Sequence, residues 1–221
     1  MGIREDIVAA VKARDVARTE ELLDRDPSVI GVKTEEGSLV LTAAYWGAGE
    51  VLELLLGRLS DLNIFEAAAV GEVDRVVNIL ESEPRMANSV NLSGYTPLGL
   101  SAFFGHKDVA RSLVERGAEI GRIQESVNAN TALDAAVAAN RVEVAEFLLI
   151  EGARANARSS GGYTPLHKAA FNGNQEMVRL LLAKGAEVGL KSDDGKTPLT
   201  LAMERGHDDL ANILRREDPV P

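Results

Sequence analysis

Histidine is the residue of this chain best suited to acid–base or metal chemistry, and the chain has three: His106, His167 and His207. A metal site or a proton relay needs such side chains to converge with carboxylates or with a nucleophile. Cysteine is absent, which removes thiolate metal sites and disulfides. The sequence also has no Gly-x-Ser-x-Gly elbow, no His-Glu-x-x-His helix and no phosphate-binding glycine loop. We therefore predict no catalytic residue, no metal site and no cofactor, provided that the three histidines lie apart.

Charge and hydropathy limit the kinds of partner. The net charge is −10, from 34 acidic and 24 basic residues, and no four basic residues cluster. Because non-specific nucleic-acid binding depends on Lys and Arg at phosphates, nucleic acid is not an expected partner. No run of 18 apolar residues and no signal-peptide core occur, so we expect no membrane span and a cytoplasmic protein.

The elements that position these residues repeat along the chain. Thr-Pro-Leu occurs at Thr164 and again at Thr197, 33 residues later, and Thr96 and Thr131 fall in the same register with a step of 35. The longer step places two extra residues near positions 124–130. A second marker, a residue suited to the left-handed conformation, lies nine positions after each Thr: Gly105, Asn140, Gly173 and Gly206, with Gly47 and Gly71 continuing the series toward the N-terminus.

Each unit contains the signals of two short antiparallel helices. Thr164 is a helix N-cap and Pro165 takes the first helical position, where its missing N–H does no harm. Apolar residues at helical spacing follow, and Gly173 supplies a left-handed stop. A second helix is predicted over about 175–184, and a Gly- and Asp-rich turn over 186–195.

The segment Gly-Tyr-Thr-Pro-Leu-His-Lys-Ala-Ala at 162–170, followed by Leu-Leu-Leu-Ala-Lys-Gly-Ala at 180–186, resembles an ankyrin repeat. The resemblance extends over nearly the whole chain. It implies an all-α solenoid of helix-turn-helix units, with β-hairpin fingers along one edge. It also implies that His167, which occupies the last position of Thr-Pro-Leu-His, forms structural hydrogen bonds within its turn. The equivalent residues in other units are Gly99, Asp134 and Thr200.

We predict a single domain over 1–221 with about seven units. Residues 10–37 resemble 67–94 at a constant offset of 57, which indicates a duplicated pair of units. Gly47 and Gly71 are only 24 positions apart, so we expect a tight connection at 60–63 and no finger between the second and third units. The predicted units are 3–36, 37–61, 62–93, 94–128, 129–161, 162–194 and 195–218.

The register of the repeats, which we call the repeat frame, places the histidines far apart. His106 and His207 both directly follow the inter-helix glycine, so they occupy one repeated position in units three repeats apart. Successive copies of a position lie about 10 Å apart. The two rings are too distant to share a metal ion, and we predict that the protein is not an enzyme.

Aromatic residues are the best candidates for a functional surface. Seven of the nine fall in three columns of the repeat, which are the last two positions of the first helix and the position before the Thr. Ankyrin repeat proteins commonly contact their targets through those columns, so we predict a partner-binding strip with a charged end in the last unit. Its residues are Tyr45, Trp46, Tyr95, Phe103, Phe104, Tyr163, Phe171, Lys196, Glu204 and Arg205.

The alternative is that the rings pack between adjacent units. This interpretation is strongest for Tyr95, Tyr163 and the first ring of each adjacent pair. Against it, neighbouring residues such as Phe103 and Phe104 point about 100° apart on a helix, so both cannot easily be fully buried.

The sequence thus favours a non-enzymatic protein-protein interaction module that binds a partner on its concave inner-helix and finger surface. One alternative is small-ligand or nucleotide binding by the aromatic strip, with Lys107, Lys168 and Arg205 as candidates to meet phosphate. Another is a homo-oligomeric scaffold. We expect a monomer rather than a homo-oligomer, and the sequence does not identify the partner.

Overall fold

The computed structural model describes residues 2–123 and 130–217, and in these ranges the chain forms fourteen α-helices, three short 3₁₀ turns and no strand. The elements are α1 (Ile3–Lys12), α2 (Val16–Arg25), η1 (Pro27–Gly31), α3 (Leu39–Tyr45), α4 (Gly49–Arg58), α5 (Ile64–Val70), α6 (Val73–Ser82), η2 (Pro84–Asn88), α7 (Pro97–Phe104), α8 (Lys107–Glu115), α9 (Ala132–Ala138), α10 (Val142–Ile150), η3 (Ser160–Gly162), α11 (Pro165–Asn172), α12 (Gln175–Ala183), α13 (Pro198–Glu204) and α14 (Asp208–Glu217).

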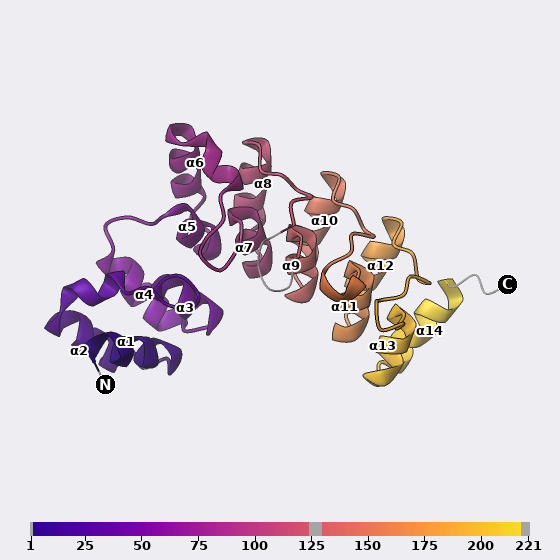
Figure 1. The fold of residues 1–221 in the computed structure, drawn as a ribbon, viewed down its shortest axis with the longest axis horizontal. Helices are drawn as coiled ribbons and strands as arrows, with labels where there is room; N and C mark the ends of the chain where they lie inside the picture. The colour runs from indigo at the N-terminus through magenta and orange to yellow at the C-terminus, as the bar shows by residue number, and fades with distance from the viewer. Residues whose placement is uncertain (1, 124–129, 218–221) are drawn as a thin grey trace.

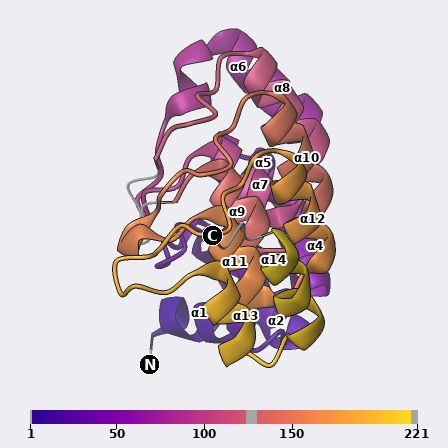
Figure 2. The same cartoon turned by 90° about the vertical axis from the view of Figure 1, so that its right-hand side faces the viewer.

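The helices form an arc of two rows. Each odd-numbered helix packs on the even-numbered helix that follows it, and α5, α7, α9, α11 and α13 pack on one another as an inner row. Helices α6, α8, α10 and α12 form the outer row (Figure 1). Connections between pairs gather along one edge of the stack (Figure 2). The predicted all-α solenoid is therefore confirmed.

Capping residues set the bounds of the inner helices. The side chains of Thr96, Thr131 and Thr197 each accept a hydrogen bond from the backbone N–H three residues later. Gly105 ends α7 in the left-handed conformation, and Asn140, with φ of 57°, does so after α9. Asn tolerates this conformation better than other side chains. The markers found in the sequence are thus the signals that start and stop the inner helices.

The apolar core is interrupted once. One cluster of buried side chains joins α5 through α14, and a second joins α1 through α4. Only residues 59–63 separate α4 from α5, which is the short connection expected there. A third, small cluster of Leu41, Ala69 and Leu100 lies between the other two, so α3, α5 and α7 hold the halves together.

Side chains of the inter-helix turns bind the preceding helix pair. His106 Nε2 donates to the Ala69 carbonyl at 2.9 Å, and His207 Nε2 donates to the Phe171 carbonyl at 3.2 Å. Arg141 occupies the same repeat position between them and donates to the Phe103 carbonyl at 3.1 Å. The two histidines therefore hold one repeated structural position and do not converge, as the repeat frame predicts.

His167 also has the predicted structural role. Its Nδ1 accepts from the Thr164 backbone N–H at 3.2 Å and lies 2.8 Å from the Thr164 hydroxyl, while its Nε2 donates to the Lys196 carbonyl at 3.0 Å. The fully buried ring thus joins the start of α11 to the turn before α13. Burial lowers the pKa of His167, although the Lys196 carbonyl acts in the opposite direction.

The β-hairpin fingers are not confirmed. One backbone hydrogen bond closes each of three turns, from Asn91 to Tyr95 at 3.0 Å, from Ser159 to Tyr163 at 2.8 Å and from Ser192 to Lys196 at 2.9 Å. None of these turns is assigned as a strand. Of the predicted two-residue insertion near 124–130, residues 124–129 lie outside the described part of the chain, and the seven-unit boundaries remain a prediction.

We predict that acid destabilises the protein before its carboxylates titrate. Burial lowers the pKa of both His106 and His167 in the folded state, so the unfolded chain takes up protons first. Their contribution to stability is complete above the unfolded value of about 6.5 and is lost as the pH falls toward the lower folded values. Urea unfolding should give a smaller free energy of unfolding at pH 5.5 than at 7.5. A His167→Gln variant should show a weaker pH dependence, and an unchanged one would contradict this assignment.

Candidate functional site

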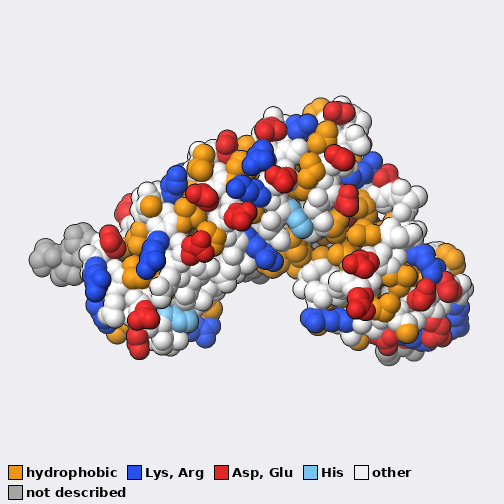
Figure 3. Space-filling model, turned by 180° about the vertical axis from the view of Figure 1, so that it is seen from behind, with side chains coloured by type: hydrophobic (Ala, Val, Ile, Leu, Met, Phe, Trp, Pro, Cys, Tyr) orange, Lys and Arg blue, Asp and Glu red, His pale blue; other side chains and the backbone are white. Residues whose placement is uncertain are grey.

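The structure divides the ten predicted site residues into three groups. Four rings lie together where the N-terminal helices meet the rest of the arc, and hydrophobic side chains gather there (Figure 3). Trp46 lies apart. The remaining five residues line one pocket toward the C-terminal end, and they are Tyr163, Phe171, Lys196, Glu204 and Arg205.

The N-terminal group is an aromatic cluster that packs α3 against α7. The centroid of Tyr45 is 5.0 Å from that of Phe104, 5.5 Å from that of Phe103 and 6.3 Å from that of Tyr95. All four rings are half-buried, and burial raises the pKa of Tyr45. Packing between helix pairs, the alternative left open by the sequence, therefore describes these rings better than an open strip.

Trp46 is accessible but held by neighbouring charges. Its side chain is 45% exposed. The indole Nε1 donates to Glu36 Oε1 at 3.2 Å, and Lys12 Nζ lies 5.3 Å from the ring centroid. Trp46 directly follows α3 and belongs to neither of the other groups.

The C-terminal group lines a pocket of about 720 Å³ on the concave face, bounded by α9, α11, α13 and the turn before α11. Phe171 lies in it with 43% of its side chain exposed. The sequence prediction had not assigned several of the other lining residues to the partner surface. Among them are Asn130, Lys168 and Leu201. Asn130 directly precedes Thr131, in the column of Tyr163 and Lys196, so the repeat frame contained the signal that identifies it.

Ion pairs and ring contacts order the open side of this pocket. Lys196 Nζ lies 2.7 Å from Glu204 Oε2, and this hydrogen bond raises the pKa of Lys196. The Tyr163 hydroxyl donates to Asp194 Oδ2 at 3.2 Å. Arg205 Cζ lies 3.7 Å from the centroid of Phe171, within cation–π range. The lining therefore offers an apolar base with charged groups held around it.

A buried ion pair forms the floor on the α9 side. Lys168 Nζ lies 2.8 Å from Asp134 Oδ1 and donates to Asn130 Oδ1 at 2.8 Å. Asp134 is fully buried, and its second oxygen accepts from the backbone N–H and the hydroxyl of Thr131. Asp134 thus binds its Thr as His167 binds Thr164. Unlike the imidazole, the carboxylate also needs a cation.

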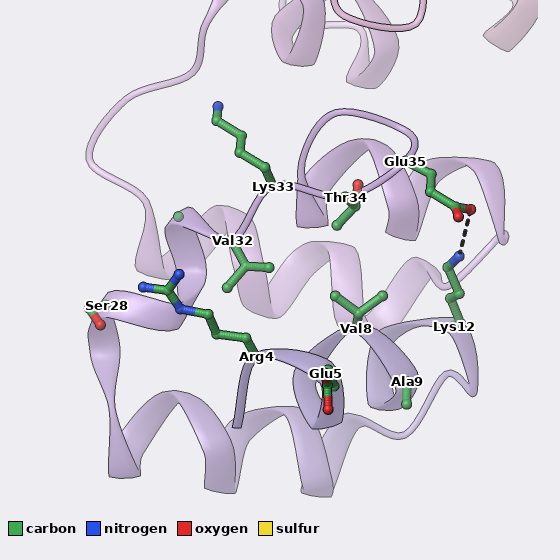
Figure 4. Close-up of a pocket in the computed structure, with 11 residues that line it drawn as sticks. Arg4, Glu5, Val8, Ala9, Lys12, Ser28, Val32, Lys33, Thr34 and Glu35 are labelled. Carbon is green, nitrogen blue, oxygen red and sulfur yellow. Dashed lines mark ion pairs between the residues drawn. The ribbon is translucent and has the colours of Figure 1, made fainter. Parts of the chain in front are cut away.

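A second pocket, of about 710 Å³, lies at the N-terminal end of the arc and contains none of the predicted residues. Figure 4 shows its side chains, contributed by α1, by η1 and by the segment after η1. Arg4, Lys12 and Lys33 lie there together with Glu5 and Glu35. Lys12 pairs with Glu35 at 3.9 Å, and Glu5 accepts from the backbone N–H of Gly2, so the charges of this pocket are mixed.

Metal and membrane sites receive no support from the described residues. Within 2–123 and 130–217, no three His, Asp or Glu side chains are grouped so as to hold a metal ion. In the same ranges no helix has both the length and the apolar character needed to cross a bilayer. The concave pocket offers a ligand an exposed aromatic ring and charged side chains held in place.

Comparison with protein families gives a direct match. The family model described as "Ankyrin repeats (3 copies)" matches residues 64–159 and 135–220. The two stretches overlap and together cover α5 through α14.

The chain is also similar to parts of curated proteins, one of which has ankyrin repeats in its name. The chain is 37% identical over 102 residues to "Ankyrin repeat and SAM domain-containing protein 6" of Mus musculus, covering 46% of this chain and 11% of that protein. It is 27% identical over 161 residues to "Probable 26S proteasome regulatory subunit p28" of Saccharomyces cerevisiae, covering 71% of this chain and 60% of the yeast protein. The match thus spans about a tenth of the mouse relative and less than two thirds of the yeast one.

We predict that replacing Lys168 destabilises the fold, because the buried carboxylate of Asp134 then has no counterion. Lys168→Met should lower the free energy of unfolding by about 2–3 kcal/mol, somewhat less than for a fully buried pair because 19% of the Lys168 side chain is exposed. Adding Asp134→His should restore most of the loss, since a neutral imidazole can bind Thr131 as His167 binds Thr164. Denaturant unfolding measures both variants, and a Lys168→Met protein as stable as the wild type would refute the ion pair's role.

We predict opposite outcomes for two phenylalanines of the inner row. Phe104→Ala should destabilise the fold by about 2–3 kcal/mol, because its ring packs on Tyr45 and Phe103. Phe171→Ala should cost about 1 kcal/mol or less, because its ring is 43% exposed. Thermal unfolding of the two variants compares the same substitution at the ends of two inner helices, α7 and α11. Equal losses would mean that Phe171 is part of the core.

Proposed function

The chain belongs to the ankyrin repeat family, whose repeats are generally protein–protein interaction modules, and from this premise we propose that it binds a partner protein on its concave face, anchored in the pocket around Phe171. The single observation that carries the proposal is the exposed ring of Phe171 in a pocket bordered by Tyr163, Lys196, Glu204 and Arg205. Tyr and Arg are enriched among the residues that dominate binding energy at protein interfaces.

The aromatic cluster has a supporting role in this proposal. Tyr45, Tyr95, Phe103 and Phe104 are half-buried, and their mutual packing keeps α3 and α7 in place. They line the same concave face, so a long partner segment could reach their exposed edges. Trp46, with 45% of its side chain exposed, would be the outermost contact at this end.

The remaining features of the proposal follow from the sequence. We propose that the protein acts as a monomer in the cytoplasm, without catalysis and away from nucleic acid, since a net charge of −10 repels phosphate. The seven predicted units, 3–36 to 195–218, would form one domain.

Nucleotide binding is less well supported by the pocket. Of the cations that it would use, Lys107 does not line the pocket, and the ammonium of Lys168 is already bound to Asp134 at 2.8 Å. Only Arg205 remains for a triphosphate.

We predict that partner capture depends on the concave face and not on the outer one. Quantitative pull-down from a lysate of the source organism should recover a defined set of proteins with the wild type, and Phe171→Ala should reduce it by at least about tenfold, as expected for an interface anchor. Ile150→Ala is the matched control, because Ile150 is 62% exposed at the end of the outer helix α10.

Two results would contradict the proposal. The Phe171→Ala protein could retain the full set of captured proteins, or Ile150→Ala could remove it. Thermal unfolding of each variant, measured alongside, ensures that a loss of capture does not come from unfolding.

A further inference from the structure

Arg205 differs from the other cations of the concave pocket. It is the C-cap residue directly after α13, and its guanidinium lies 3.7 Å from the centroid of Phe171. Within residues 2–123 and 130–217, its side chain forms no ion pair and no hydrogen bond, and this ring is its contact. A guanidinium has five N–H donors, so those of Arg205 are available to a ligand.

The two lysines of the pocket are already neutralised. Lys168 is bound to the buried carboxylate of Asp134 at 2.8 Å, and Lys196 is bound to Glu204 at 2.7 Å. Arg205 is therefore one positive charge without a counterion in the pocket of a chain whose net charge is −10. A chain with 34 acidic residues places none of them against this guanidinium among the described residues.

Stacking prepares the guanidinium for one kind of ligand. A cation held over an aromatic ring loses little further freedom on binding, and arginine's planar fork matches a carboxylate with two parallel hydrogen bonds. The adjacent apolar surface of Phe171, Leu201 and Ala138 would cover a neighbouring apolar side chain of the same ligand.

We propose that this pocket binds an acidic side chain, Asp or Glu, of a partner protein segment, with Arg205 as its counterion and an apolar neighbour of that residue on Phe171. The inference rests on the proposed function and names the chemistry of the partner. A carboxylate fits better than a phosphate, because one unpaired cation beside the carboxylate of Glu204 offers one net charge, whereas a phosphate brings close to two.

A peptide selection tests the proposal without knowledge of the natural partner. Random linear peptides displayed at the N-terminus of a phage coat protein are selected on the immobilised full chain. Because such peptides have no free C-terminus, every selected carboxylate comes from a side chain. The selected peptides should be enriched in Asp or Glu next to an aromatic or aliphatic residue, and their binding should weaken as salt is raised.

Variants test whether Arg205 is the residue that binds the carboxylate of the selected peptides. Arg205→Gln should weaken binding of the selected peptides by at least about tenfold, which is the lower range for a hydrogen bond to a charged group. Arg205→Glu should select basic residues in place of acidic ones. Arg111→Gln is the matched control and should leave binding unchanged, because Arg111 also lies over a phenylalanine, Phe147 at 5.8 Å, but on outer helix α8.

The outcomes separate the two proposals. Peptides that require Phe171 but show no acidic enrichment, or bind Arg205→Gln as well as the wild type, would overturn the carboxylate inference alone. Peptides that bind the outer face, and that bind the Phe171→Ala variant as well as the wild type, would overturn the concave-face function as well. A library that yields no binder would count against both.

Discussion

Close packing of small side chains on the inner helices is the constraint on which the rest of the structure depends. Alanines such as Ala102, Ala136 and Ala169 are fully buried between neighbouring helix pairs. No helix pair can bury its apolar face alone, so each one needs the next. Large rings lie instead at the ends of inner helices, as Phe104 does in α7 and Phe171 in α11. Phe104 is half-buried there, and Phe171 is exposed.

The interruption after α4 shows what happens where the stacking is imperfect. With only residues 59–63 between α4 and α5, the apolar core divides into two clusters. Tyr45 fills the interruption, packing on Phe103 and Phe104 across it. The turn before α7 adds a polar contact, as the Ser93 hydroxyl donates to the Glu35 carbonyl at 2.7 Å. Rings that could have been a binding surface are used there to join the halves, whereas stacking between α9 and α13 is regular and Phe171 stays accessible.

Features that depend on neighbouring residues along the chain could be predicted from the sequence. The Thr caps, the left-handed Asn140 and the short connection before α5 follow from the repeat frame, and the resemblance to ankyrin repeats implies the bond of His167 to Thr164. Contacts between residues far apart could not. The pairing of Asp134 with Lys168 depends on the stacking of α9 against α11, and no single repeat contains both residues.

The division of the predicted aromatic strip into separate groups also depends on contacts between residues far apart in the chain. Six of the seven rings lie in α3, α7 or α11 or in the turns before α7 and α11, and Trp46 directly follows α3, but the columns do not encode which rings touch. Whether a ring is covered depends on how successive helix pairs stack, and the apolar core divides at the short connection of residues 59–63. Asn130 occupies the same repeat position as Tyr163 and Lys196, so part of the pocket lining could be predicted from the sequence.

We propose that the protein meets its partner in the concave pocket between α9 and α13. Hydrogen–deuterium exchange of the protein with and without a captured partner tests it most directly, because protection is measured segment by segment. We expect slower exchange on binding in residues 159–172 and 196–205, with little change in α8, α10 and α12. Protection confined to those outer helices, with none around Phe171, would contradict it.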